Sequence, residues 1–270
     1  MKKYDLCNSP FYKLRSSKKL CEILGIKSEK KLRDIINKNL YREKNDGKRI
    51  YYIPINSLRS IHDRIHELFS RIKAPFYLHS GVQGKSNVTN ACLHAYSDGL
   101  IKTDIKNFFP STNIEKIKRF FLCKMHCSQR VSWLLSKITT FNGTVPIGSP
   151  CSMDIAFWTN NEMFEEIEKI CKSSKAKFTL YVDDISISMK GLNRRILRRV
   201  NSIIKKNGYG YHKERIYKPK KPKVITGVAL HEKKNTAVKA VHKKIMGLHP
   251  SNPRLKGTKG YIKYIQKVSQ

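Results

Sequence analysis

The chain has 270 residues, with 55 lysines and arginines against 20 aspartates and glutamates, so its formal net charge is +35. This charge excludes an ordinary neutral metabolic enzyme and indicates a polyanionic partner, either nucleic acid or an acidic membrane surface; a ribosomal-type structural protein would also carry it. The apolar content of 40% is enough to bury a core, so we expect one large domain or two small ones.

The first third of the chain predicts helices around one hairpin. Residues 1 to about 40 show helical apolar spacing among basic residues, and residues 41–53 alternate around Asn45-Asp46-Gly47, which is typical of a β-hairpin turn. Apolar residues then recur every three or four positions from about 57 to 72, which predicts a helix that ends before Pro75.

The rest of the chain predicts a sheet layered on helices. The patterns indicate, in chain order, a helix at 87–95, a strand at 100–105, a helix starting at Ser111 or Asn113, a helix at 152–172, a hairpin at 178–189, an amphipathic helix around 196–204, and two basic helices at 236–246 and 255–268. The composition becomes more basic after Tyr217, where we expect a domain boundary; a solvated basic tail is the simpler alternative for the first residues that follow.

The cysteines and the N-terminus indicate the compartment. Seven cysteines are scattered without a Cys-x-x-Cys pair, which favours reduced thiols in a reducing environment. Cys123 and Cys127 flank His126, but no second ligand pair follows, so a zinc site is not expected. The chain has neither an apolar leader nor a long apolar run, so we expect a protein that is neither secreted nor membrane-spanning.

Three aspartates carry the chemistry. Asp183 and Asp184 sit at the turn of the predicted 178–189 hairpin, where aspartate is also common for purely structural reasons. Asp104 ends a strand-like segment, and an acid at that position points into a cleft. Three carboxylates in so basic a chain would form a cage of oxygen ligands for Mg²⁺, and two such ions could catalyse nucleotidyl transfer.

Five motifs resemble a known family. Tyr181-Val182-Asp183-Asp184 is similar to the YxDD box of reverse transcriptases, Asp104-Ile105-Lys106-Asn107-Phe108-Phe109 to their first catalytic-acid motif, and Pro146-Ile147-Gly148-Ser149-Pro150-Cys151-Ser152 to their PQGxPxS segment. Asn90-Ala91-Cys92-Leu93-His94 and Ile225-Thr226-Gly227 resemble the NAxxH and VTG motifs of the bacterial retron branch. The order and spacing match across most of the chain, which therefore resembles retron-type reverse transcriptases.

The resemblance implies an α+β fold, a right-hand polymerase with fingers, a palm whose antiparallel sheet lies on helices, and a short helical thumb. We expect N-terminal helices and fingers in residues 1–99, the palm with interleaved fingers elements in 100–216, and the basic thumb in 217–270.

The resemblance also implies the catalytic residues. Asp104, Asp183 and Asp184 would be the catalytic acids, and together with the carbonyl of Ile105 they would hold two Mg²⁺ ions. Phe109 would pack under the sugar and exclude a 2′-hydroxyl, although core packing is the alternative for this side chain.

Further residues are candidates for binding the incoming nucleotide. Lys48 and Arg49, on the second strand of the predicted hairpin, offer charge-assisted donors to the triphosphate. Ile147 and Gly148 belong to the same set, but Ile147 stands where the family usually has a glutamine. Cys151 likewise replaces a hydroxyl residue, so we infer altered handling of the nucleotide or the template.

The retron-like motifs imply an RNA partner. Asn90, His94, Thr226 and Gly227 would recognise a structured RNA, although a buried structural role is the common one for a histidine such as His94. Basic thumb residues would contact RNA phosphates and 2′-hydroxyls, and we assign this role to Lys243 and Lys244.

The function that follows is an RNA-directed DNA polymerase of retron type in the bacterial cytoplasm. It would use dNTPs to copy part of a bound non-coding RNA into short DNA; antiphage defence with an effector protein is implied by the family alone. A defence-associated reverse transcriptase with an unusual template and a catalytically inactive RNA-binding scaffold remain alternatives. A group II intron maturase or an attached RNase H is not expected, since no residues follow Gln270.

Overall fold

The computed structural model describes residues 2–95, 97–191, 194–219, 221–230, 236–237, 239–243, 246 and 252–268. The chain divides into two compact units, and each is assembled from two separate stretches of sequence. Unit 1 comprises Met1–Ala74 and Asn107–Asn161, and unit 2 comprises Pro75–Lys106 and Glu162–Gln270. The boundaries of fingers, palm and thumb stay predictions.

Unit 1 is mostly helical and contains one two-stranded hairpin. Its elements are the 3-10 helix η1 (Leu6–Asn8), α1 (Ser17–Leu24), α2 (Glu29–Asn37), β1 (Tyr41–Asn45), β2 (Ile50–Pro54), α3 (Asn56–Ser70), α5 (Phe108–Ser111), α6 (Ile114–Arg119), the π-helix η2 (Phe120–Lys124), α7 (Gln129–Ile138) and α8 (Ser152–Thr159). The predicted hairpin and the long helix that follows it are confirmed as β1, β2 and α3.

The core of unit 1 forms where helical apolar faces meet. Phe11 stacks on Phe69 of α3 with ring centroids 5.6 Å apart, and the edge of Phe121 lies against Phe69. Serine hydroxyls accept backbone hydrogen bonds at the first turns of α1, α2 and α7, which satisfies donors that would otherwise lack partners.

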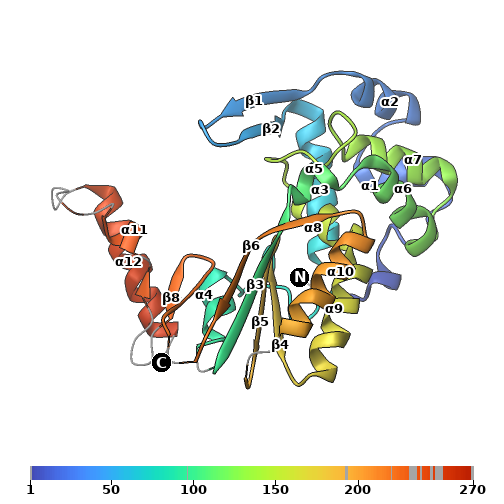
Figure 1. The fold of residues 1–270 in the computed structure, drawn as a ribbon. Coiled ribbons are helices and arrows are strands. Elements are labelled where there is room, and N and C mark those ends of the chain that lie inside the picture. Colours follow the sequence, from blue (N-terminus) through green and yellow to red (C-terminus); the bar gives the residue numbers. More distant parts are fainter. Residues whose placement is uncertain are drawn as a thin grey trace. The chain divides into compact units, whose positions relative to one another are not determined.

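Unit 2 contains a four-stranded antiparallel sheet in the order β4-β5-β3-β6. Figure 1 shows α9 and α10 on one side of this sheet and α4 with a small three-stranded sheet on the other. The elements are α4 (Asn87–Cys92), β3 (Gly99–Lys106), α9 (Asn161–Ser173, which begins at the unit boundary), β4 (Lys177–Tyr181), β5 (Asp184–Met189), α10 (Arg194–Lys206), β6 (Gly210–Tyr217), β7 (Lys223–Ile225), β8 (Val228–Leu230), β9 (Thr236–Ala237), α11 (Lys239–Lys243) and α12 (Pro253–Val268). The predicted α+β fold with an antiparallel sheet is confirmed.

Alternation along the strands gives the sheet two different faces. Ile185 and Ile187 are buried towards one side together with Thr103, whose hydroxyl donates to Asn201 of α10. Asp184 and Ser188 point to the opposite side, because residues two and four apart on a strand share a face. Asp184 and its register partner Asp104 therefore lie on the face that carries α4.

Several predicted elements differ from the structure. The single helix predicted over 152–172 is wrong: α8 ends before Asn160, whose side-chain amide donates to the carbonyl of Ala156 at 2.8 Å, and α9 starts at Asn161. The helix predicted over 236–246 is also wrong at its start, since Thr236–Ala237 is a strand and α11 begins at Lys239. The sequence patterns predicted neither α7 nor β6.

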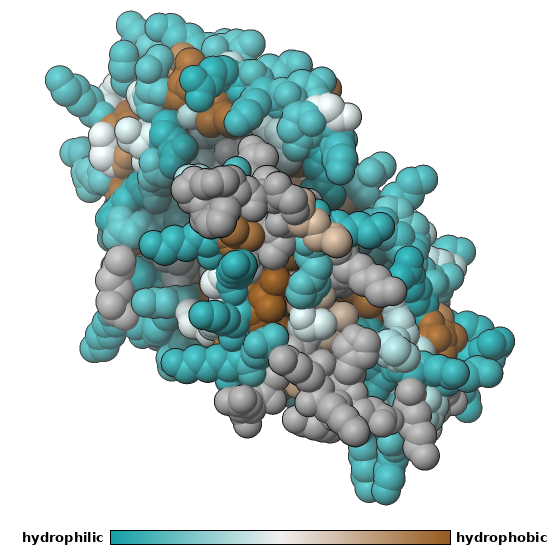
Figure 2. Space-filling view, turned by 90° about the vertical axis from the view of Figure 1, so that its left-hand side faces the viewer, coloured by the Kyte–Doolittle hydropathy of each residue, from teal (hydrophilic) through white to brown (hydrophobic). Residues whose placement is uncertain are grey.

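The face of the molecule shown in Figure 2 is strongly polar. Hydrophilic residues cover most of the face shown in Figure 2, and hydrophobic residues appear there as separate patches. None of the helices in the described part of the chain combines the length and the apolar character needed to cross a membrane.

Candidate active site

The two adjacent aspartates lie at the tight turn between β4 and β5. The strand register pairs Tyr181 with Asp184, so Val182 and Asp183 form the connection. Val182 has a φ of +61°, in the left-handed region that a β-branched residue avoids. A turn of this kind persists only where its surroundings hold it.

Strand pairing brings the third aspartate to the same place. Asp104 of β3 is the register partner of Asp184 on β5, and side chains in such pairs have Cβ atoms about 4.5–5.5 Å apart. The backbone N–H of Ile105 also donates to the carbonyl oxygen of Asp183 at 2.9 Å, which ties the turn to β3. The structure thus brings Asp104, Asp183 and Asp184 together at one end of the sheet.

The three carboxylates repel one another electrostatically. Burial raises the pKa of Asp183 to about 6, and the charges of Asp104 and Asp184 act in the same direction. Burial also raises the pKa of Asp184, although the nearby Lys102 offsets part of this effect. An added cation would relieve the repulsion, so the arrangement favours binding of positive charge.

Basic side chains of the same unit meet two of these acids. Lys102 Nζ lies 2.8 Å from Asp184 Oδ2, and Lys213 Nζ lies 3.2 Å from Asp104 Oδ2. His212 Nε2 bonds the other oxygen of Asp104. His212 and Lys213 lie on β6, and sequence reasoning missed both, because residues 210–217 show no clear alternation of apolar and polar residues.

A segment outside the sheet braces the strained turn. The Oγ of Ser80 accepts a hydrogen bond from the backbone N–H of Val182 at 2.8 Å. The preceding residues run beside β4: His79 N–H donates to Leu180 O at 2.9 Å, and Leu180 N–H donates to Tyr77 O at 2.8 Å. The hydrogen bond from the Val182 N–H to the Ser80 hydroxyl therefore helps to hold Val182 in its left-handed conformation.

The family profile described as "Reverse transcriptase (RNA-dependent DNA polymerase)" matches residues 27–240, well over half of the chain. The chain belongs to the reverse transcriptase family. The predicted resemblance to this family is confirmed. That Asp104, Asp183 and Asp184 are its catalytic acids stays a prediction.

The similar proteins include retron enzymes. The chain is 34% identical over 148 residues to the Retron Se72 reverse transcriptase of Salmonella heidelberg (strain 579083-10), covering 54% of this chain and 38% of that protein. It is 24% identical over 154 residues to the Retron Ec86 reverse transcriptase of Escherichia coli, covering 56% of this chain and 48% of that protein. The matches thus span less than half of either relative.

One solved structure that the chain matches is described as the foamy viral protease-reverse transcriptase dRH in complex with ds DNA. It matches with a TM-score of 0.46 and 16% sequence identity, covering 83% of this chain and 35% of that chain.

Reverse transcriptases generally use divalent metal ions, and the acids of this chain suit that role as donors. Asp184 Oδ1 is buried and has no hydrogen-bond partner among the described residues, so it is an orphaned oxygen at the site. Asp104, Asp183 and Asp184 would hold the ions, since carboxylate oxygens are the preferred ligands of Mg²⁺. As the side chains stand, no three His, Cys, Asp or Glu residues in the described part are placed to hold a metal together. The contribution of the Ile105 carbonyl stays a prediction.

The predicted triphosphate ligands lie on unit 1. Lys48 and Arg49 are exposed in the turn before β2, so their placement on the second strand was wrong by a residue or two. Their backbone N–H groups both donate to Asp46 Oδ1, at 2.9 and 2.8 Å. The Asp46 carboxylate thus fixes the turn that presents the two cationic side chains.

The predicted Gly148 and Ile147 loop packs on the same hairpin. The carbonyl of Ile147 accepts a hydrogen bond from Tyr52 N–H at 2.7 Å. Gly148 has a φ of +107°, and a Cβ there would lie 3.3 Å from Tyr51 Cβ and 3.4 Å from Ile53 Cγ1. This close approach explains the glycine, because a side chain would force the hairpin away.

A buried histidine holds the other side of this loop. The Nε2 of His62 bonds the carbonyl of Ile138 at 2.7 Å, so Nε2 carries the proton and Nδ1 accepts from the Ser149 hydroxyl at 2.6 Å. Burial lowers the pKa of His62 to about 4, which keeps the ring neutral. The Cys151 thiol lies 3.4 Å from the Ser149 hydroxyl, so it takes part in this network.

Phe109 lies on the short helix α5 of unit 1. Its side chain is half-buried, and its ring centroid lies 5.8 Å from that of the buried Phe108. Part of the ring is exposed and could therefore contact the sugar of a nucleotide. Its role in excluding a ribose 2′-hydroxyl stays a prediction.

The retron-like motifs meet each other inside unit 2. The Asn90 amide donates to the Thr226 hydroxyl at 3.4 Å, and that hydroxyl donates to the carbonyl of Asn87 at 2.9 Å. Asn87 also donates to the Tyr261 hydroxyl of α12 at 2.7 Å. Gly227 completes the turn with a φ of +83°. The two motifs therefore join α4 to the C-terminal part of the chain.

His94 is fully buried beneath the sheet. Its Nδ1 bonds the Ser188 hydroxyl and its Nε2 the Thr179 hydroxyl, each at 2.7 Å. These contacts fit the structural alternative for this histidine, and a role for Asn90 or His94 in RNA recognition stays a prediction. Lys243 is exposed on α11, whereas Lys244 lies outside the described residues.

Proposed function

We propose that the protein is an RNA-directed DNA polymerase of retron type that copies part of a bound structured non-coding RNA into short DNA. The observation that carries the proposal is the convergence of Asp104, Asp183 and Asp184 at one end of the sheet in a member of the reverse transcriptase family. Retron enzymes among its relatives support the retron assignment.

The roles follow from the chemistry of each residue. The three aspartates would supply oxygen ligands for Mg²⁺, which when bound activates a 3′-hydroxyl and neutralises the leaving pyrophosphate. Lys48 and Arg49 would bind the triphosphate of a dNTP, and Phe109 would exclude a ribose. Lys102 and Lys213 neutralise the acids before the metal binds, and we expect them to release Asp184 and Asp104 when it does.

The first test is primer extension with dNTPs and Mg²⁺ on a primed RNA template. The Asp183→Asn/Asp184→Asn variant is expected to lose activity by about three orders of magnitude or more, because metal ligands contribute several kcal/mol to catalysis. Asp34→Asn, which removes an exposed acid of α2, is the matched control and should retain activity. Synthesis that survives in the double variant would sink the proposal.

The retron part has its own test. Nucleic acid that copurifies with the protein from its host is sequenced for both RNA and DNA, beside the double variant. A discrete RNA joined to a complementary DNA, absent from the variant, is the expected result. DNA that does not complement the bound RNA would contradict a retron mechanism while leaving polymerase activity intact.

A catalytically inactive RNA-binding scaffold is the second candidate. It is favoured by two ion pairs, Lys102 with Asp184 and Lys213 with Asp104, because these lysines take the place that a metal ion would have at two of the three acids. RNA binding without any Mg²⁺-dependent synthesis on several primed templates would establish it.

The retron resemblance extends the proposal to antiphage defence with an effector protein. Plating efficiency of phage on cells that carry the native locus tests this role. We expect protection to disappear in the Asp183→Asn/Asp184→Asn strain; equal protection in both strains would exclude a role for synthesis.

A further inference from the structure

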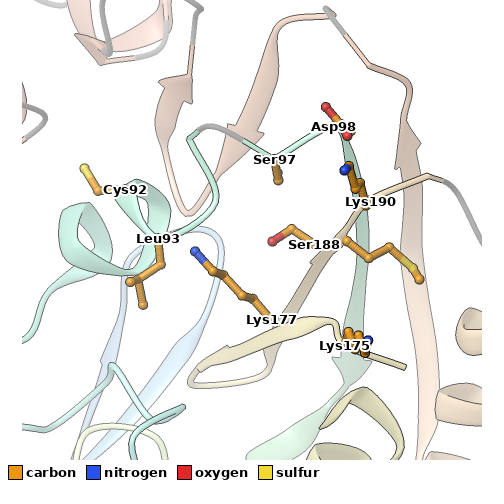
Figure 3. Close-up of a pocket in the computed structure, with 9 residues that line it drawn as sticks. Cys92, Leu93, Ser97, Asp98, Lys175, Lys177, Ser188 and Lys190 are labelled. Atoms are coloured by element: carbon orange, nitrogen blue, oxygen red, sulfur yellow. The ribbon is translucent and has the colours of Figure 1, made fainter. Parts of the chain in front are cut away.

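A lysine-rich pocket of about 460 Å³ lies in unit 2, at the opposite end of the strands from the acids. It is bordered by the end of α4, the start of β4 and the end of β5 (Figure 3). The residues that matter for its chemistry are Cys92, Ser97, Lys175, Lys177, Ser188 and Lys190.

The pocket shares the face of the sheet that carries the catalytic acids. Lys177 of β4 is the register partner of Ser188 on β5. Ser188 and Asp184 are separated by an even number of positions on β5, so their side chains point to the same side, on the order of 13 Å apart. The pocket is therefore separate from the acids but aligned with them along one face.

The charge of the pocket is not compensated within the described part of the chain. Lys175, Lys177 and Lys190 are exposed and form no ion pair with a described residue, and Asp98 is the single acid among the described lining residues. In Figure 3 the Lys177 ammonium and the Ser188 hydroxyl face the same space between α4 and β5. The pocket thus offers an anion several donors from different elements.

The buried His94, which is hydrogen-bonded to Ser188 of the pocket, lies close to some of the same positive charges. His94 bonds the Ser188 hydroxyl, and its pKa is depressed to about 3. Burial is the largest cause, and the neighbouring His79 and the lysines Lys177, Lys223 and Lys102 lower it further. An anion in the pocket would offset the effect of these charges.

We propose that this pocket binds a phosphate-bearing nucleotide, supplied by an RNA strand that lies along the sheet face towards the acids. Lysine ammonium groups are strong phosphate donors, and the volume lies in the range of small-ligand sites. The alignment with Asp184 favours a polymer over a free nucleotide. The proposal rests on the proposed function only for the choice of RNA, and it is tested by binding, without synthesis.

Cys92 gives a local readout of occupancy. Its thiol borders the pocket, whereas Cys7 and Cys123 are exposed on unit 1 and serve as internal references. Alkylation by N-ethylmaleimide is followed for each cysteine by mass spectrometry, with a short single-stranded RNA in one arm and ATP in another. At saturating RNA we expect alkylation of Cys92 to slow by at least about threefold relative to Cys7 and Cys123, because occupancy removes the accessible state.

A charge-matched pair of variants separates the pocket from general attraction to a basic protein. Lys177→Gln/Lys190→Gln should abolish the protection of Cys92 and reduce the salt slope of RNA binding by about 1.4, because each lysine that no longer meets a phosphate lowers the slope by roughly 0.7. Lys27→Gln/Lys30→Gln removes two exposed lysines of unit 1 and should preserve the protection. Thermal unfolding should match the wild type in both, since all four side chains are exposed.

Each outcome decides the proposal. Protection by RNA alone supports a strand as the source of the nucleotide, and equal protection by ATP supports the pocket with a free nucleotide as its source. No protection by either probe, or undiminished protection in Lys177→Gln/Lys190→Gln, overturns it. Because no step requires DNA synthesis, a protein that fails to polymerise can still pass this test.

Discussion

Val182 holds a backbone conformation that a β-branched residue avoids, and the hydroxyl of Ser80 holds its N–H at 2.8 Å. We expect Ser80→Ala to lower kcat by about tenfold with little change in the KM for dNTP, because losing one buried hydrogen bond costs about 1–1.5 kcal/mol and loosens the turn that carries the acids. Single-turnover primer extension measures this, and Ser80→Thr, which keeps a hydroxyl, should restore the rate.

A second substitution tests whether Ser80 acts by holding the strained backbone of Val182. Glycine adopts positive φ without a steric penalty, so in Val182→Gly the turn should depend less on the hydrogen bond to Ser80. In that background Ser80→Ala is expected to reduce kcat by clearly less than it does beside valine. Equal losses in the two backgrounds would show that Ser80 does not act through Val182.

Phe109 is the residue assigned to sugar discrimination. Removing its half-exposed ring in Phe109→Ala should improve incorporation of ribonucleotides relative to deoxyribonucleotides, on the order of tenfold, because a pocket distinguishes substrates by what its walls exclude. The ratio of kcat/KM for dNTP and rNTP is the measurement, and Phe109→Tyr, which keeps the ring, is the control. An unchanged ratio in Phe109→Ala would leave only a packing role.

The acids could be predicted from sequence, whereas their basic partners could not. Asp183 and Asp184 interrupt a short alternating pattern, and Asp104 ends another, so each signal is local. Lys213 meets Asp104 only because β6 pairs with β3 across an irregular register, and that pairing is long-range and leaves no local pattern.

At the scale of elements, two buried histidines connect helices to neighbouring strands and loops by hydrogen bonds. His94 joins α4 to β4 and β5, and His62 joins α3 to the loop before α8. Burial lowers their pKa values to about 3 and about 4. The unfolded chain therefore takes up protons near pH 6.5 that the folded protein takes up only at lower pH.

The sign of the effect is destabilisation by acid. Each histidine reduces the free energy of unfolding by about 1.4 kcal/mol per pH unit as the pH falls from about 6.5 towards its folded pKa. Urea unfolding at pH 7.5 and 5.5 measures the change. His94→Gln should shrink the difference between the two pH values by about 1 kcal/mol, even though the variant is less stable at both; an unaltered difference would argue against a neutral buried His94.

Elements with a strong internal period were predictable, and their interruptions were not. The hairpin of β4 and β5 and the amphipathic α10 match their sequence patterns. The apolar pattern over 152–172 continues smoothly across Asn160, so the break between α8 and α9 depends on packing and side-chain hydrogen bonding, which periodicity does not record.

At the scale of the whole molecule, a net charge of +35 would make electrostatics the leading contribution to the proposed binding of RNA. Lys243 is exposed on α11, in the part of the chain predicted to be the thumb, and its predicted role is to contact RNA. Lys243→Gln should weaken RNA binding and reduce the slope of log K against log salt by about 0.7. Fluorescence anisotropy across a salt series measures this, with Lys30→Gln as the control. If the slope of log K against log salt is the same for Lys243→Gln and the wild type, Lys243 does not contact an RNA phosphate.

The interleaving of the two units affects how the protein is made. The chain passes from one unit to the other at residues 74–75, 106–107 and 161–162. During synthesis, β3 leaves the ribosome with both of its edges unpaired, and its partners β5 and β6 follow only after more than 75 further residues. At about 5–20 residues per second, β3 waits for several seconds while open edges invite pairing with other chains. Nascent chains stalled before Tyr217 should therefore depend on chaperones, and slower translation alone would not help them fold.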